Sequence, residues 1–217
     1  MNWLLFTHLA CTNSKSTDTA PEQIDTVATG LVMATVAMDY SVGALATFDP
    51  EVEILNENIS SISGDPALVL DGGFLWQINR YQYDTLRKYD LSNLQVPLTE
   101  VSLAPDVGSS NPHDVAVCGG QVFVSLYGAA SLPVLDIDTL TETSSIDLSE
   151  WADEDGIPEA SSMVVVDDQL FVGLQRLDRN AGFTPLDSIV LQVDCATQIV
   201  TNNWEVGQNI ELIEWDD

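Results

Sequence analysis

The residues of this chain that are able to bind a ligand lie in a few short polar segments, and arginine stands out among them. The chain has only six Lys and Arg residues. Three of them, Arg80, Arg176 and Arg179, fall in two of these segments. A guanidinium can hold a carboxylate or phosphate through two parallel hydrogen bonds, so the cluster predicts a site for a small anionic ligand or a protein partner, with Asp178 beside it. The alternative is that Arg176 and Arg179 form internal ion pairs with neighbouring aspartates.

His113 is a second candidate, because it is the only histidine after residue 8. It lies in the sequence Asn-Pro-His-Asp, between Asn111 and Asp114. An imidazole next to a carboxylate can act as a general base, so all three are candidate binding residues. A histidine that bonds a neighbouring loop carbonyl is the alternative. The chain contains no nucleophile elbow, no phosphate-binding glycine loop and no CxxC pair, so no catalytic machinery is visible.

The acidic segment 153–159 is a third candidate, with carboxylates at Asp153, Asp155 and Glu159. Carboxylates together with loop carbonyls are ligands for hard cations, and calcium is the cofactor that we expect if an ion binds there. The spacing differs from that of a twelve-residue EF-hand loop, and an acidic segment exposed to solvent is the alternative.

The overall charge excludes some classes of partner. The chain has 34 Asp and Glu residues and a formal net charge of −28. Such a surface repels phosphates and anionic lipid headgroups, so we expect no nucleic acid partner and no direct membrane contact. It is typical of an exported protein or of one from a salty habitat.

The candidate segments lie between the β-strands of a fourfold repeat. In each repeat an apolar run, a loop and a second apolar run ending at an aspartate precede a polar strand. The turn aspartates are Asp49, Asp90, Asp138 and Asp194, about 40 to 55 residues apart. This is the length of one four-stranded propeller blade. The sequence predicts an all-β fold, a β-propeller with about four four-stranded antiparallel blades over residues 31–206.

The third and fourth repeats divide most clearly into strands. The predicted strands are 113–118, 121–126, 133–138 and 143–148 in the third repeat, and 162–166, 170–175, 189–194 and 199–206 in the fourth. Gly72-Gly73, Gly119-Gly120 and, in the same place, Asp167-Asp168 predict tight hairpin turns. In a propeller the loops between second and third strands and those between blades open on one face, so the candidate segments are predicted to share that face.

The chain resembles the YVTN-type β-propeller proteins of bacterial envelopes in four segments, which read SNPHDVAV, VFVSLYG, DGIPE and LFVGLQRLDRNAGFTPLDS. The resemblance is most specific over residues 110–127 and 155–194. It implies a seven-bladed architecture and an envelope location, and many such proteins are lipoproteins without an assigned activity. The YVTN tetrapeptide itself is absent. Because four repeats are fewer than seven, three interpretations remain. The chain is a truncated copy of a longer protein, or two copies form a homodimer that completes the ring, or four blades close into a ring by themselves.

Both ends of the chain carry their own signals. Residues 1–11 form an apolar start that ends in Leu-Ala-Cys and resembles a lipoprotein export signal, with Cys11 as the lipidated residue, although no Lys or Arg precedes the apolar run. Residues 12–30 read as a Ser/Thr-rich linker, and residues 207–217 as an acidic tail or the start of a further blade. We expect export to the periplasm or the outer cell surface, with any membrane contact made through a lipid anchor.

Cys118 and Cys195 are the two other cysteines. In an oxidising compartment they can form a bridge between neighbouring blades, and two buried free thiols are the alternative.

The sequence favours an exported, envelope-associated module that binds a ligand or protein through its loop-rich face without catalysis. One alternative is a divalent-metal propeller hydrolase with Asn111, Asp155 and Glu159 in its channel. A purely structural scaffold is the other.

Overall fold

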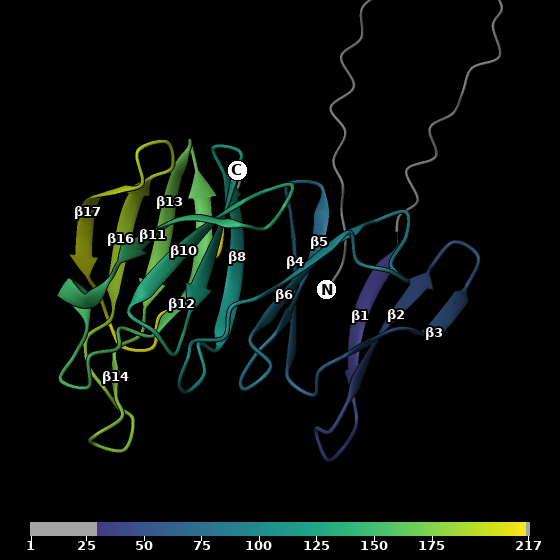
Figure 1. Ribbon diagram of the computed structural model, residues 1–217, viewed down its shortest axis with the longest axis horizontal. Coiled ribbons are helices and arrows are strands. Elements are labelled where there is room, and N and C mark those ends of the chain that lie inside the picture. Colours follow the sequence, from purple (N-terminus) through teal and green to yellow (C-terminus); the bar gives the residue numbers. More distant parts are fainter. Residues whose placement is uncertain (1–29, 216–217) are drawn as a thin grey trace, which may run out of the picture.

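The computed structural model of the chain describes residues 30–215, which form a row of antiparallel sheets (Figure 1). The leader prediction over residues 1–11, with Cys11, and nearly all of the linker lie outside the described residues. Each main sheet is one blade of a partial propeller. Among residues 30–215 no helix is long and apolar enough to cross a membrane.

The strands follow one another in chain order within each blade. The first blade has β1 (Leu31–Val36), β2 (Gly43–Asp49) and β3 (Ile54–Ile62), and the second has β4 (Pro66–Asp71), β5 (Phe74–Asn79), β6 (Thr85–Asp90) and β7 (Thr99–Ser102). The third has β8 (Pro112–Cys118), β9 (Gln121–Leu126), β10 (Ser131–Asp136) and β11 (Glu142–Asp147), followed by the short 3-10 helix η1 (Ser149–Trp151). The fourth has β12 (Ala160–Val166), β13 (Gln169–Leu174), β16 (Ile189–Asp194) and β17 (Ile199–Glu205). The small hairpin of β14 (Leu177–Asp178) and β15 (Thr184–Pro185) is inserted between β13 and β16.

The predicted fold class is confirmed, with one difference in the first blade, which has three strands among the described residues. A second difference concerns the turn of the third blade, where the sequence prediction was wrong. Strand β10 ends at Asp136, so Asp136 and not Asp138 is its turn aspartate. Asp136 Oδ1 accepts hydrogen bonds from the backbone N–H of Thr139 at 2.8 Å, as Asp194 Oδ1 does from Thr197 at 2.8 Å. The Asp-x-x-Thr spacing alone does not distinguish the two aspartates, because Asp138 likewise has Thr141 three residues later; the strand end and the hydrogen bonds do.

The three predicted hairpin turns are confirmed, and their backbone explains their sequences. Both residues of each pair have positive φ: 58° and 79° at Gly72-Gly73, 58° and 76° at Gly119-Gly120, and 50° and 59° at Asp167-Asp168. Two successive positive φ angles define the turn that suits the twist of a two-residue hairpin. Glycine and aspartate tolerate this conformation better than other residues, which explains why they recur there.

The hydrophobic core lies between blades and not within them. Successive residues of a strand point to opposite faces of its sheet. Val122 and Val124 of β9 therefore pack toward the second blade, whereas Phe123 packs toward the fourth. A third cluster, which includes Leu45 and Tyr89, joins the first blade to the second. Each blade is consequently stabilised by its neighbours.

A disulfide and a set of hydrogen bonds add further links between blades. Cys118 at the end of β8 and Cys195 just after β16 form a disulfide with their Cα atoms 5.7 Å apart, so the structure contains the bridge and not two free thiols. Near the axis, an oxygen of Asp114 in β8 accepts from the N–H of Met163 in β12 at 2.7 Å. Ser162 Oγ of β12 accepts in turn from the N–H of Leu212 at 2.8 Å. Leu212, beyond the last strand, therefore lies beside β12 as β12 lies beside β8.

Candidate functional site

The loops that carry the predicted binding residues contact one another at one end of the blades. The N–H of Tyr81, in the β5–β6 loop, donates to Asn111 Oδ1 at 3.1 Å. Arg179, in the β14–β15 region, donates through Nη2 to the carbonyl oxygen of Tyr127 at 2.6 Å. The loop-rich face predicted from the repeat thus brings together segments from the second, third and fourth blades.

Arg179 binds internal acidic residues. Its Nε donates to Glu159 Oε1 at 2.9 Å and lies 4.0 Å from Asp155 Oδ2. Glu159 is fully buried, and it also accepts from the N–H of Leu177 at 2.9 Å. Burial raises the pKa of Glu159 to about 7, although the Leu177 N–H and Arg179 act in the opposite direction. Arg179 therefore holds the β14–β15 insertion against the loop that precedes β12.

The other cationic side chains also have protein acceptors. Arg80 donates to Asp65 Oδ1 through both Nε and Nη2, at 3.2 and 2.6 Å. Arg176 donates to the carbonyl oxygen of Asp187 at 3.1 Å. Two more cations bind acceptors elsewhere in the chain, Arg87 the carboxylate of Glu100 and Lys88 the carbonyl oxygen of Ile137. Within residues 30–215, every Lys and Arg side chain is thus committed to a contact within the chain.

Three carboxylates of the loop-rich face lie close together. One oxygen each of Asp153, Asp155 and Asp178 lie within 4.8 Å of one another. Burial, together with the nearby carboxylates of Asp155 and Asp178, raises the pKa of Asp153. Asp153 Oδ2 is buried and has no hydrogen-bond donor among the described residues. Glu159, predicted as a third ligand, binds Arg179 instead, and Asp178 takes its place in the cluster.

His113 packs against an aromatic ring and does not bind its neighbouring carboxylate. Its imidazole stacks on Tyr127, with ring centroids 4.2 Å apart and an angle of 13° between the planes. Burial, together with the positive charge of Arg80, lowers the pKa of His113 to about 4. The imidazole is therefore neutral at neutral pH. Asp114 Oδ1 and Oδ2 accept from the backbone N–H groups of Val115 and Met163, both outside this ring pair.

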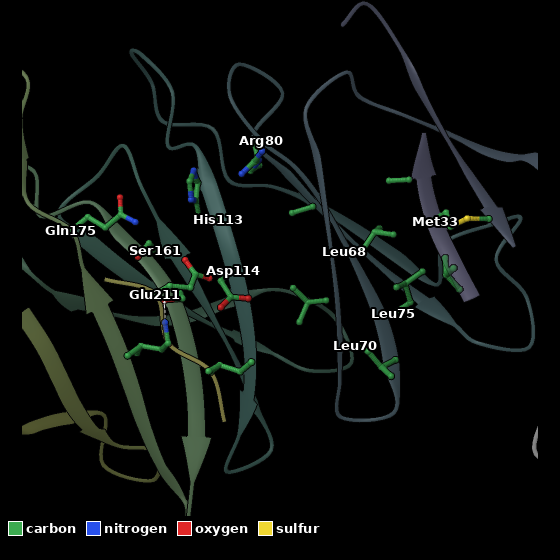
Figure 2. Close-up of a pocket in the computed structure, with 17 residues that line it drawn as sticks. Met33, Leu68, Leu70, Leu75, Arg80, His113, Asp114, Ser161, Gln175 and Glu211 are labelled. Carbon is green, nitrogen blue, oxygen red and sulfur yellow. Dashed lines mark hydrogen bonds between the residues drawn. The ribbon is translucent and has the colours of Figure 1, made fainter. Parts of the chain in front are cut away.

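A groove of about 1080 Å³ lies along the inner strands of the four blades. Most of its lining comes from β1, β4, β8 and β12 and from residues 211–213, and Leu75 of β5 and the loop residues Arg80 and Gln175 complete it. Figure 2 shows two different walls. Apolar side chains lie on one side, and those labelled in the figure are Met33, Leu68, Leu70 and Leu75. Polar side chains lie on the other, and those labelled are Arg80, His113, Asp114, Ser161, Gln175 and Glu211.

The polar wall carries net negative charge. Arg80 is the only Lys or Arg in the lining, and its charge is balanced by Asp65. Asp114 and Glu211 have no cationic partner in the described part of the chain. Burial, with a smaller contribution from the negative charges of Glu211 and Asp71, raises the pKa of Asp114 to about 6, although the N–H groups of Met163 and Val115 act in the opposite direction. At neutral pH Asp114 is consequently charged in most molecules.

Two residues important to this site were missed at the sequence level. Tyr127 joins the ring stack to Gln175, because its hydroxyl donates to Gln175 Oε1 at 2.7 Å. Glu211 enters the groove because residues 210–212 turn back to β12. Tyr127 could have been found from the sequence, because it is an aromatic residue that directly follows the apolar strand VFVSL and so begins the β9–β10 loop. No local pattern identified the second.

Comparisons with known proteins support the fold. No protein-family model matches the chain, and no curated protein matches it. Several solved structures match it. Hydrazine synthase from Kuenenia stuttgartiensis matches at 16% identity and a TM-score of 0.58, covering 81% of this chain and 49% of its own. The β-propeller domain of Cps50 (Swd1) from Myceliophteria thermophila matches at 14% identity and a TM-score of 0.55, covering 82% of this chain and 56% of its own.

A third solved structure, a putative 6-phosphogluconolactonase from Bacteroides fragilis, matches at 14% identity and a TM-score of 0.50, covering 87% of this chain and 58% of its own. The chain thus spans about half the length of these solved structures. At such low identities the likeness shows a propeller fold and not an activity.

Proposed function

We propose that this protein is a non-catalytic binding module that holds a ligand in the groove along its inner strands. The observation that carries the proposal is the groove itself, about 1080 Å³ with one apolar and one polar wall. Ligand sites are typically concave and mostly apolar, with a few polar groups that orient the ligand. The loops of the loop-rich face form one end of this groove, where Arg80, His113 and Gln175 contribute to its lining.

The contacts of the candidate residues favour binding over catalysis. His113 is stacked and neutral, and its pKa of about 4 leaves it a weak base. In the alternative hydrolase, Asn111 and Glu159 would hold a metal with Asp155. Asn111 Oδ1 already accepts from Tyr81, and Glu159 already binds Arg179.

We also propose that the protein is exported and envelope-associated, as the YVTN-type resemblance implies. The Cys118–Cys195 disulfide supports this location, because disulfides form and persist in oxidising compartments outside the cytosol. The large excess of acidic residues is compatible with the same location.

Nile red, a neutral dye that fluoresces in apolar sites, tests the binding function. We expect it to bind with one-to-one stoichiometry, and the variant Leu70→Asp to weaken binding at least about tenfold by placing a charge on the apolar wall. Leu91→Asp is the matched control. Leu91 is 38% exposed and Leu70 is 42% exposed, but Leu91 lies outside the groove. Equal weakening by both variants, or no dye binding at all, would refute the proposed function.

Calcium is our second proposal, as a ligand of the loop-rich face. The observation in its favour is the buried Asp153 Oδ2, which has no donor among residues 30–215 and lies next to Asp155 and Asp178. Carboxylate oxygens are the ligands that calcium prefers. Such an ion would hold the segment before β12 to the β14–β15 insertion without taking part in a reaction.

A further inference from the structure

We infer that the ligand of the groove is an amphiphilic cation, an organic amine with an apolar body. This inference rests on the proposed binding function and names the class of ligand for the same site. The amine would face Asp114 and Glu211, and the apolar body would lie against Leu68, Leu70 and Met33.

The charges of the groove select for a cation. Asp114 and Glu211 both line it, and neither forms an ion pair within the described residues. Asp114 is held in place, because its two oxygens accept from the N–H groups of Val115 and Met163 at 2.8 and 2.7 Å. A carboxylate oxygen can accept more than one hydrogen bond, so Asp114 retains capacity for a ligand donor. An ammonium group supplies three donors and no acceptor, which matches this wall.

The cations of the protein do not favour an anion in the groove. Arg80 is the only Lys or Arg in the lining, and its Nε and Nη2 both donate to Asp65 Oδ1. The remaining Lys and Arg side chains of residues 30–215 bind protein acceptors outside the lining. An anionic ligand would therefore meet two carboxylates and no free cation. The negative charge of the whole chain adds to this repulsion over longer distances.

The opposite wall requires an apolar body on the same ligand. It combines side chains from β1 and β4, among them Val32, Ala34, Leu68 and Leu70. Leu70 is 42% exposed, so a bound apolar chain would cover surface that is now in contact with water. Burial of such surface is favourable in proportion to the apolar area removed from water. A polyamine without an apolar body would use only one of the two walls.

Isothermal titration calorimetry of the full chain with four matched probes tests the inference at pH 7.5 and low salt. The probes are octylamine, octanol, octanoate and spermidine. We expect octylamine to bind about tenfold more tightly than octanol, because two partly exposed carboxylates attract its charge. Octanoate should bind more weakly than octanol, and spermidine more weakly than octylamine.

Two variants locate the charge effect. Glu211→Gln changes an exposed residue outside every strand, so it should leave folding intact and weaken octylamine about threefold. Asp114→Asn should add a similar loss, and both together should make octylamine bind like octanol. Glu205→Gln is the control, since Glu205 is also exposed but lies outside the groove. Octanol binding should not change in any of these variants.

The outcomes separate this inference from the proposed function. If octanol and Nile red bind but octylamine binds no more tightly, the inference is wrong and the binding function stands. Octanoate binding as tightly as octylamine would likewise overturn the inference, as would octylamine binding that is unchanged in Glu211→Gln and in the double variant. If Nile red does not bind, the proposed function itself is wrong.

Discussion

Replacement of Arg179 by alanine should destabilise the protein strongly at alkaline pH and much less at acidic pH. The guanidinium contacts Glu159 Oε1 at 2.9 Å and the carbonyl oxygen of Tyr127 at 2.6 Å. Arg179→Ala leaves the fully buried Glu159 without its cation. Loss of one partner of a buried ion pair costs about 3–5 kcal/mol. Because the Arg179 side chain is 31% exposed, we expect the lower value of about 2–3 kcal/mol at pH 8.

The pH dependence follows from the protonation of Glu159. Its pKa in the folded protein is about 7, above the value of 4.5 expected in the unfolded chain. Between these two values the folded state holds one more proton, so the contribution of Glu159 to stability falls as the pH rises from 4.5 to 7. At pH 5 the buried carboxyl is neutral with or without Arg179. The cost of Arg179→Ala should therefore fall to about 1 kcal/mol, mainly the lost bond to Tyr127.

Thermal unfolding of wild type and variant at pH 5 and pH 8 measures this difference. For a domain of this size, 2–3 kcal/mol corresponds to about 5–10 °C in Tm. Arg87→Ala is a suitable control, because its partner Glu100 is partly exposed and the pair should contribute only about 1 kcal/mol at either pH. An Arg179→Ala variant that melts like wild type at pH 8, or that loses as much at pH 5, would refute this account of the ion pair.

Three further predictions concern the disulfide, calcium and the pH dependence of binding. Cys118→Ser opens a loop of 77 residues and should cost about 4 kcal/mol, seen as a lower urea midpoint; an unchanged midpoint would contradict this. Calcium at a hundred times its Kd should add about 2.7 kcal/mol to wild type but not to Asp178→Asn, and an equal rise in Tm for both would exclude the carboxylate cluster. Octylamine should bind more tightly at pH 7.5 than at pH 5, because Asp114 gains its negative charge in that range. Its pKa is about 6, raised by burial and by the negative charges of Glu211 and Asp71. A flat profile would show that Asp114 does not contact the amine.

The fold was accessible from the sequence because a propeller repeats its local signals. Hairpin pairs such as Gly119-Gly120 and turn aspartates such as Asp194 recur at a spacing that matches one blade. Each of these signals depends on a few neighbouring residues, as in the turn where the N–H of Thr197 donates to Asp194. The error at Asp138 arose because two aspartates stand two residues apart and each has a threonine three residues later, so only the hydrogen bonds that Asp136 accepts from Thr139 identify the turn residue.

The candidate site was only partly accessible, because its properties depend on pairings between blades. The sequence placed Arg80, Arg179 and His113 on one face, and the structure gives them contacts on that face. It did not show that Arg80 binds Asp65, which lies fifteen residues earlier. It also did not show that Glu211 returns to the groove, since that position is set by a bond between Leu212 and Ser162, fifty residues apart. The groove and its charge emerge only when four strands from four repeats lie side by side.

Backbone amide NMR of the isotope-labelled full chain during titration with octylamine tests the central claim most directly, namely that the inner strands form the binding site. We predict saturable shifts confined to β1, β4, β8, β12 and residues 210–213, with Leu70, Asp114 and Ser162 among the most affected. Shifts confined to the exposed outer strands β3 and β17, or an absence of saturable shifts anywhere, would contradict the claim.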